Sequence, residues 1–333
     1  MKKKVIEMIQ DYVHFEDNEL EIALVTFNRP LFVKEWISKN ICDINKRNIK
    51  LSVYDSSTND ETLNIISDFN KSNSMMVIGY KRIDSSTSIG YKPIIPMLET
   101  RSKYIWIAGD SRYHDFNQLD KKVFPYIKNE IDWVLLHIVN NDDNDGKVYS
   151  NQEELLKECF VSMTCIGLSI YKSKVLKNFY KNKEELKKSD LLFKSNYAFA
   201  WLGYYLTAYS SDLNFKTLFS KVSIFDISPQ KKVQQWRKRF LESWIDDLCG
   251  LLDNLPSSYG DINDVVKTTW QVLKLDDKST LRHLRAYGDL NFKNIKKYRK
   301  NGNLLRVTDK SLYFKFLCFI PRFLLRFLLS IRK

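Results

Sequence analysis

The fold is decided by the stretch Glu21-Ile22-Ala23-Leu24-Val25-Thr26-Phe27-Asn28-Arg29-Pro30, in which an apolar run stops at a polar turn. A short continuous apolar run is typical of a strand that is buried on both faces of a parallel sheet. Two later stretches repeat the pattern, Leu51-Ser52-Val53-Tyr54-Asp55 and Tyr104-Ile105-Trp106-Ile107-Ala108-Gly109-Asp110. Each predicts a buried strand that ends at a polar or acidic side chain.

Apolar residues at helical spacing follow these runs, first at Phe32, Trp36, Ile37 and Ile41. We expect further strands at 49–54, 75–80, 132–139 and 165–171, and helices at 1–18, 63–69, 94–101 and 197–209. Such alternation implies parallel pairing through right-handed crossovers. After Ser228-Pro229 only helical stripes remain. The predicted fold class is therefore α/β, a Rossmann-like, mostly parallel sheet flanked by helices, with an α-helical C-terminal region.

Polar side chains end three of the predicted strands. In an open α/β sheet, ligands bind in the crevice beyond the carboxyl ends of the strands. We therefore expect Asn28, Asp55 and Asp110 to line the rim of one site. The plainer interpretation of each turn, a loop with a helix cap and no ligand, stays open at this stage.

Two motifs carry a family resemblance. Thr26-Phe27-Asn28-Arg29-Pro30 is close to a Thr/Tyr-Asn-Arg-Pro turn, and Asp55, Ser57, Asp60 and Thr62 fit an Asp-x-x-Ser/Thr-x-Asp-x-Thr turn after the next strand. In this order the motifs resemble the nucleotide-sugar half of family 2-like glycosyltransferases with a GT-A fold. The resemblance covers about the first two thirds of the chain, and it is best over residues 20–112.

The resemblance implies a donor site for a nucleoside diphosphate sugar, with UDP favoured. Its predicted donor-binding residues are Thr26, Asn28, Arg29, Asp55, Ser57, Lys92 and Asp110, of which Asp55 would contact the base. Lys92 follows Gly90-Tyr91 at the place where the family has a basic or amide residue, and it either reaches a phosphate or stays in solvent. The implied reaction is inverting transfer to a saccharide or lipid-linked glycan acceptor in surface polysaccharide or glycoconjugate synthesis.

The acidic motif departs from the family pattern. Asp-x-Asp normally holds a divalent cation against the diphosphate, whereas this chain has Asp110-Ser111-Arg112. Either Arg112 offsets the diphosphate charge itself, since its guanidinium fork suits phosphate, or Asp110 still binds Mn²⁺ or Mg²⁺ with help from His114 or Asp115. The candidate general base is Asp190, the only carboxylate between Glu185 and Asp212; a surface helix cap is the alternative for Asp190.

Composition excludes several other chemistries. The five cysteines have no Cys-x-x-Cys spacing and only four histidines occur, which argues against disulfide frameworks and zinc sites. The ten glycines are too widely spaced for a P-loop or a dinucleotide-binding loop. The basic start, Met1-Lys2-Lys3-Lys4, precedes no apolar core for export, so we expect a cytoplasmic protein.

The C-terminal end concentrates the charge. Residues 281–333 contain fourteen Lys and Arg against two Asp, and so carry about +12 of the formal +13. Residues 311–333 are rich in Phe and Leu, with Lys315, Arg322, Arg326 and Lys333 in one helical stripe. Pro321 and two central arginines oppose a spanning helix, so we expect a basic amphipathic helix lying in an anionic membrane surface, with its cations at headgroup level. Packing on neighbouring helices is the alternative.

These observations combine into three segments and one location. The predicted segments are a GT-A-like catalytic domain at 1–229, a helical domain at 230–310 and the membrane-associating helix at 311–333. The protein would associate peripherally with the inner face of the cell membrane. Nucleic acid is not expected as a partner because stacking platforms do not need long aliphatic runs; a homo-oligomer is left open. A non-catalytic GT-A-like scaffold, or a nucleotide-sugar-binding subunit of a glycan assembly complex, is the alternative function.

Overall fold

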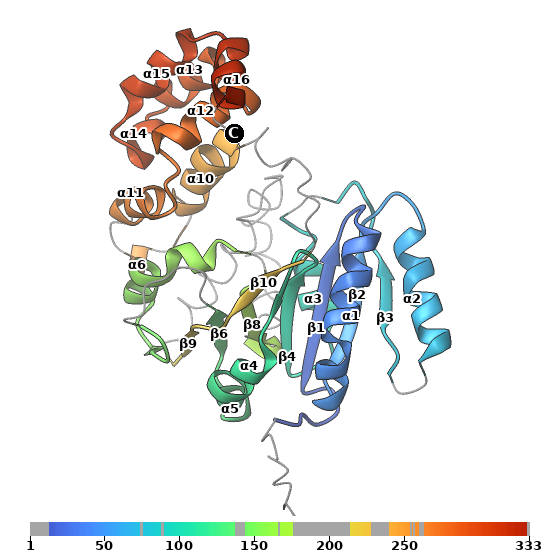
Figure 1. The fold of residues 1–333 in the computed structure, drawn as a ribbon. Helices are drawn as coiled ribbons and strands as arrows, with labels where there is room; N and C mark the ends of the chain where they lie inside the picture. Colours follow the sequence, from blue (N-terminus) through green and yellow to red (C-terminus); the bar gives the residue numbers. More distant parts are fainter. Residues whose placement is uncertain are drawn as a thin grey trace, which may run out of the picture.

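The computed structural model describes residues 13–73, 76–87, 90–136, 144–165, 167–175, 214–227, 240–253, 255, 257–259 and 263–331 of the 333-residue chain. Its centre is an eight-stranded sheet with the order β3-β2-β1-β4-β8-β6-β9-β7. Helices flank this sheet, and a second group of helices built from the C-terminal residues lies beyond one end of it (Figure 1). The predicted α/β class with a helical C-terminal region is confirmed.

The first half of the sheet is parallel and follows the sequence pattern closely. Strands β1 to β4 pair in parallel in the order β3-β2-β1-β4. The elements of this half are β1 (Leu20–Thr26), α1 (Pro30–Lys46), β2 (Lys50–Asp55), α2 (Glu61–Ser72), β3 (Gly79–Arg82), α3 (Ile94–Glu99) and β4 (Tyr104–Gly109). Helix α1 has Pro30 at its first position, where the missing N–H is not needed.

The second half of the sheet is mixed. Its elements are β5 (Arg112–His114), α4 (Phe116–Lys122), α5 (Phe124–Lys128), β6 (Trp133–Leu136), β7 (Val148–Tyr149), α6 (Gln152–Met163), β8 (Ser169–Lys172), β9 (Thr217–Ser220) and β10 (Ile224–Asp226). Strand β8 runs antiparallel to both β4 and β6, which the alternation of strands and helices in the sequence did not predict. The mostly parallel character of the sheet still holds, because β6 and β9 pair in parallel.

A glycine explains how β8 enters in the reverse direction. The chain reaches β8 at the carboxyl end of β4, where Gly167 has φ of 98°. A Cβ at this position would lie 3.3 Å from the backbone nitrogen of Gly109. Only glycine combines this left-handed backbone with so close an approach. The carbonyl of Gly167 also accepts a 3.0 Å hydrogen bond from Nε1 of Trp106, which fixes the entrance of β8 beside the end of β4.

Two hydrophobic clusters cover the two faces of the sheet. One joins Leu24 and Trp106 to residues of α1, α2, α4 and α5. The other joins Ile105 and Ile107 to α3 and α6, and it continues without a break into the C-terminal helices as far as Cys318. Alternate residues of β4 thus point to opposite faces, as a strand requires.

The described C-terminal residues, from 240 onward, form helices joined by short turns and no strand. The elements are a π-helical segment (Glu242–Asp247), α10 (Leu248–Asp253), a 3₁₀ turn (Ser257–Tyr259), α11 (Asn263–Val272), α12 (Lys278–Tyr287), α13 (Phe292–Lys300), α14 (Asn303–Val307), α15 (Ser311–Phe319) and α16 (Arg322–Ile331). Among the described residues, no helix has both the length and the apolar character needed to cross a bilayer.

Several predicted boundaries differ from the structure. The third strand is β3, Gly79–Arg82, which begins four residues later than the predicted start at Met75. The side chain of Asn70 bonds both the N–H and the carbonyl of Ile78, so Ile78 lies before the strand. Residues 13–18 are not helical, since Phe15 inserts into the core and donates its N–H to the carbonyl of Arg47. The expected helix at 197–209 lies outside the described residues.

Candidate donor-binding site

The site begins with the register of three neighbouring strands. Thr26 at the end of β1 pairs with Asp55 at the end of β2, and Val25 pairs with Gly109 at the end of β4. Because these strands are parallel, the residues that follow them emerge at one edge of the sheet. The predicted juxtaposition of Asn28, Asp55 and Asp110 is therefore present. We call these carboxyl ends, residues 26–29, 55–58 and 110, the strand-end site.

Asp110 is the buried charge of this site. Its carboxylate is 4 % exposed, and it accepts hydrogen bonds from Oγ1 of Thr26 at 2.7 Å and from Nη1 of Arg29 at 2.6 Å. Burial raises the pKa of Asp110, while the charge of Arg29 and the hydrogen bond from Thr26 act in the opposite direction. The guanidinium of Arg29 also lies 3.8 Å from the ring centroid of Phe32. Arg29 and Asp110 therefore form a fixed pair from two different strand ends.

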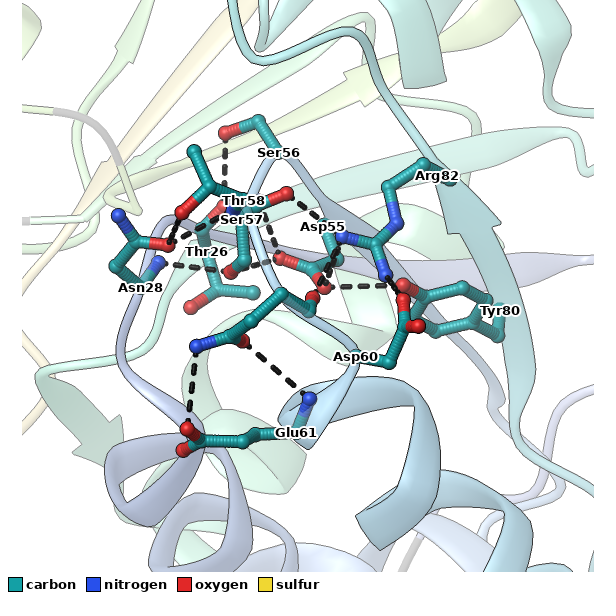
Figure 2. A network of polar contacts seen from close by, with 11 residues as sticks. Thr26, Asn28, Asp55, Ser56, Ser57, Thr58, Asp60, Glu61, Tyr80 and Arg82 are labelled. Atoms are coloured by element: carbon teal, nitrogen blue, oxygen red, sulfur yellow. Dashed lines mark hydrogen bonds and ion pairs between the residues drawn. The ribbon is translucent and has the colours of Figure 1, made fainter.

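Asn28 joins the first strand end to the second. Its backbone is left-handed, with φ of 51°, a conformation that asparagine adopts more readily than most residues. Its N–H donates to Oγ of Ser57 at 2.7 Å, and its Oδ1 accepts from the N–H of Thr58 at 2.9 Å. Figure 2 shows this bridge between the two loops. The side chain of Asn28 therefore positions the loop that follows β2.

Asp55 lies under that loop and is completely buried. One carboxylate oxygen accepts from both the N–H and the hydroxyl of Ser57, and the other accepts from the hydroxyl of Tyr80 at 3.0 Å. Burial, followed by the bond to Asp55, raises the pKa of Tyr80 to about 12. In this state Asp55 organises the loop from within. Contact with a base would require Tyr80 or Arg82 to move aside.

The structure adds Arg82, which the sequence analysis missed. Its Nη1 donates to the carbonyls of Ser57 and Asn59, and its Nη2 pairs with Asp60 at 2.5 Å (Figure 2). Nη1 also lies 3.8 Å from the carboxylate of Asp55. Arg82 ends β3, so it obeys the same rule as the other three strand ends. The strand-end rule would have selected Arg82, but the predicted strand stopped two residues earlier, at Tyr80.

Lys92 lies beside the strand-end site. Its Nζ is 4.7 Å from the ring centroid of Phe27, the exposed residue directly after β1. Partial burial lowers the pKa of Lys92, and the charge of Asp84 opposes this shift. The ammonium group of Lys92 thus lies over an aromatic ring at the rim, and its contact with a phosphate stays a prediction.

Arg112 lies on a small two-stranded sheet next to the site. Its strand, β5, pairs antiparallel with β10, and Nε of Arg112 lies 3.4 Å from Oδ1 of Asp226. Both side chains are exposed. Asp226 is the second residue that the sequence analysis missed, and no motif pointed to it because β10 was not predicted. Asp190, the candidate general base, lies outside the described residues.

The metal alternative finds little support from the donor set. Asp115 uses its carboxylate to cap α4, accepting from the N–H groups of Asn117 and Gln118. His114 is buried against Trp106, and burial lowers its pKa to about 3. Within the described ranges, no three His, Cys, Asp or Glu side chains lie together as a group that could hold a metal ion by itself. Asp110 is paired to Arg29 at 2.6 Å, so its carboxylate would have to exchange this partner to hold a divalent cation.

Comparisons with known proteins agree on the fold. No family model matches the sequence, and a search of curated proteins finds no significant match. Among solved structures, the mannosyltransferase PcManGT from Pyrobaculum calidifontis, in complex with GDP-Man and Mn²⁺, superposes with a TM-score of 0.52 at 11 % identity over 92 % of this chain and 87 % of its own.

A second solved structure gives the same result. TarS from S. aureus, residues 1–349 in complex with UDP-GlcNAc, has a TM-score of 0.50 at 10 % identity over 88 % of this chain and 82 % of its own. Both neighbours are GT-A-type glycosyltransferases. The chain therefore has the GT-A glycosyltransferase fold, as predicted, while the roles of the individual site residues stay predictions.

Proposed function

We propose that this protein transfers a sugar from a nucleoside diphosphate donor, UDP-linked, to a saccharide or lipid-linked glycan acceptor, with inversion. The observation that carries the proposal is the register that brings Thr26, Asp55 and Asp110 to one edge of a GT-A sheet. Two neighbours of the same fold are named as complexes with GDP-Man or UDP-GlcNAc. A surface glycan or glycoconjugate precursor is the acceptor class that we propose.

In this proposal the loop after β2 holds the nucleoside. Asp55, Ser57 and Asn28 form a closed hydrogen-bonded unit there, so the loop needs little ordering when a ligand arrives. A preorganised loop lowers the entropic cost of binding. Displacement of the Tyr80 hydroxyl would free one oxygen of Asp55 for a donor group on the edge of a base.

The leaving diphosphate gains negative charge as the glycosidic bond breaks. Fixed cations aimed at that charge stabilise the transition state without reorganisation. Arg29, Lys92 and Arg112 are the cations that we propose for this role. Arg29 offers Nη1 to Asp110 and keeps its other N–H donors for a phosphate. Asp226 would restrain Arg112 until the diphosphate competes for it.

The remaining parts of the proposal rest on the sequence. Asp190 would act as the general base on the acceptor hydroxyl. Residues 1–229 would form the catalytic domain, 230–310 a helical domain, and 311–333 the segment that contacts the membrane. The protein would work in the cytoplasm, at the inner face of the cell membrane, where lipid-linked acceptors lie.

A panel of nucleotides tests this proposal. Calorimetric titration and thermal unfolding would be measured with UDP, GDP and their sugar conjugates, with and without Mn²⁺, followed by assays of donor hydrolysis and transfer. We expect a UDP-linked donor to raise the melting temperature and to be turned over without added metal. If no donor is turned over and none shifts the melting temperature, the proposal fails.

A non-catalytic scaffold or nucleotide-sugar-binding subunit is the second candidate, and one observation favours it. Both carboxylates at the strand ends already have partners, since Asp55 is covered by Tyr80 and Ser57, and Asp110 pairs with Arg29. Donor binding without hydrolysis or transfer would support this candidate. Turnover that is lost in an Asp110→Ala variant would exclude it.

A further inference from the structure

Both arginines of α16 bond to backbone carbonyls at the end of α12. Nε of Arg326 donates to the carbonyl of Ala286 at 2.9 Å, and Nη2 of Arg322 donates to the carbonyl of Gly288 at 3.1 Å. Both acceptors lie at the C-terminal end of α12, where carbonyls lack helical partners and cations are favourable. These bonds fix both guanidinium groups against α12, while their contact with lipid headgroups stays a prediction.

A third arginine completes this clamp from the opposite side. Arg285 of α12 donates to the carbonyls of Cys318 and Ile320 at the end of α15, both at 3.1 Å. The carbonyls at the end of α12 therefore accept from arginines of α16, and those at the end of α15 accept from an arginine of α12. As a result, α12 and the corner between α15 and α16 are fixed to one another by charge-assisted hydrogen bonds.

With its arginines bonded to α12, α16 presents an apolar surface to solvent on its other side. Only Leu325 of this helix is buried, and five of its large apolar side chains are 41–74 % exposed, namely Phe323, Leu324, Phe327, Leu328 and Ile331. These positions recur at i, i+1, i+4, i+5 and i+8, which is one continuous helical face. A face of this kind on a soluble domain marks a site of interaction.

The apolar face continues at the corner before α16. Phe319 is 67 % exposed, and its ring meets that of Phe292 edge-on at a centroid distance of 4.7 Å. We call Phe319 and the five exposed side chains of α16 the lipid-facing surface. Helix α16 has ten residues, about 15 Å, which is half of a bilayer's apolar thickness, so it can only lie in the plane of a membrane.

Charge decides which partner fits this surface. Residues 310–333 contain six Lys and Arg and no Asp or Glu. Lys315, Lys293 and Lys296 are exposed, and the last two follow Phe292 on α13. A two-fold dimer through this surface would bring such like charges together, because the same patch meets itself. An anionic lipid surface instead complements both the apolar face and its cations.

We infer that the lipid-facing surface is a preformed in-plane membrane contact for anionic lipid, held in place by Arg285, Arg322 and Arg326. The inference deepens the proposed function, from which it takes the membrane as partner. Apolar side chains enter the boundary between headgroups and acyl chains, while exposed lysines beside them meet the phosphates.

Vesicle flotation of the full-length chain tests the inference. Vesicles of phosphatidylglycerol with phosphatidylcholine would be compared with phosphatidylcholine alone, at low and high salt. We expect binding to the anionic vesicles that weakens with salt, and a decrease of about tenfold or more in the partition coefficient of Phe323→Ser/Phe327→Ser. The matched control is Leu305→Ser/Val272→Ser, which removes two exposed apolar side chains from the same group of helices and should bind as the wild type does.

Three results would overturn the inference. The first is equal vesicle binding by Phe323→Ser/Phe327→Ser and the wild type. The second is equal wild-type binding to neutral and anionic vesicles. The third is a dimer in sedimentation velocity that depends on Phe323 and Phe327 while the chain ignores vesicles. Calorimetric binding of UDP to the same variants tests the donor site separately. A variant that loses vesicle binding but still binds UDP leaves the proposed reaction intact.

Discussion

Asp110 in the strand-end site and Asp289 between the C-terminal helices are both buried carboxylates, but their surroundings differ. Asp110 has Arg29 at 2.6 Å, a cation from a neighbouring strand end. Asp289 accepts the N–H of Leu241 at 2.8 Å, and the charge of the acidic Glu242 raises its pKa further. Burial raises the pKa of both, to about 6 for Asp289. In the first region a cation lies beside the buried carboxylate, whereas in the second the carboxylate has backbone N–H donors and an acidic neighbour.

The arginines of the two regions also differ in the groups that they bond. Arg29 and Arg82 bond to loops and carboxylates at the sheet edge, and that edge stays polar. Arg322 and Arg326 bond to backbone carbonyls, and the outer side of their helix becomes apolar. The same residue type thus prepares one surface for a charged ligand and another for lipid, depending on which acceptors lie within reach.

The largest effect is expected for Asp110→Ala. Removing the carboxylate leaves the guanidinium of Arg29 without its buried partner and frees Thr26, so the cation that we propose for the diphosphate loses its position. Transition-state stabilisation should fall by about 100- to 1000-fold in kcat/KM for the donor. Donor hydrolysis and calorimetry measure the loss. The control is Asp115→Ala, which removes a helix cap nearby, costs about 1 kcal/mol of stability and should leave donor affinity unchanged.

Asp289→Asn should have the next largest effect, and it appears as a dependence on pH. The folded pKa is raised from 3.8 to about 6, so the folded state binds more protons between these values, and stability falls as pH rises from about 4 to about 6. The asparagine variant lacks this loss while keeping an acceptor for Leu241. Its stability relative to the wild type should therefore improve by about 2 kcal/mol between pH 4 and pH 7. Chemical denaturation at several pH values measures this difference; a constant difference would contradict it.

The strand-end site could be predicted because its information is local. The end of each strand is marked in the sequence by a change from apolar residues to a turn. Parallel pairing then brings these carboxyl ends to one edge of the sheet. Asp55, Asn28 and Asp110 follow from that rule. Arg82 obeys the rule too, and was missed only because the strand boundary was set too early. Asp226 could not be predicted, since it reaches Arg112 through pairing of β5 and β10, two strands of three residues each.

The orientation of α16 could not be read from its periodicity. A helical wheel shows that Arg322 and Arg326 share a stripe, but it does not show what the stripe faces. That depends on the end of α12, about forty residues earlier, whose carbonyls attract the arginines. The sequence therefore predicted a helix with separate apolar and basic sides, but it could not predict that Arg322 and Arg326 bond to the end of α12.

The smallest effects come from a reciprocal pair of variants that separates the two regions. Arg82→Ala removes three bonds to the loop after β2, so donor affinity should weaken by about tenfold, with vesicle binding unchanged. Lys81→Ala is the control, because its exposed side chain pairs with Glu99 outside the loop.

Arg326→Ala should give the opposite result. Loss of its bond to Ala286 loosens α16, so amide exchange in that helix should become several-fold faster and vesicle binding weaker, with donor affinity unchanged. If either variant changed both readouts alike, the strand-end site and the lipid-facing surface would be energetically coupled, and the contrast between them would have to be replaced by a model in which membrane contact regulates donor binding.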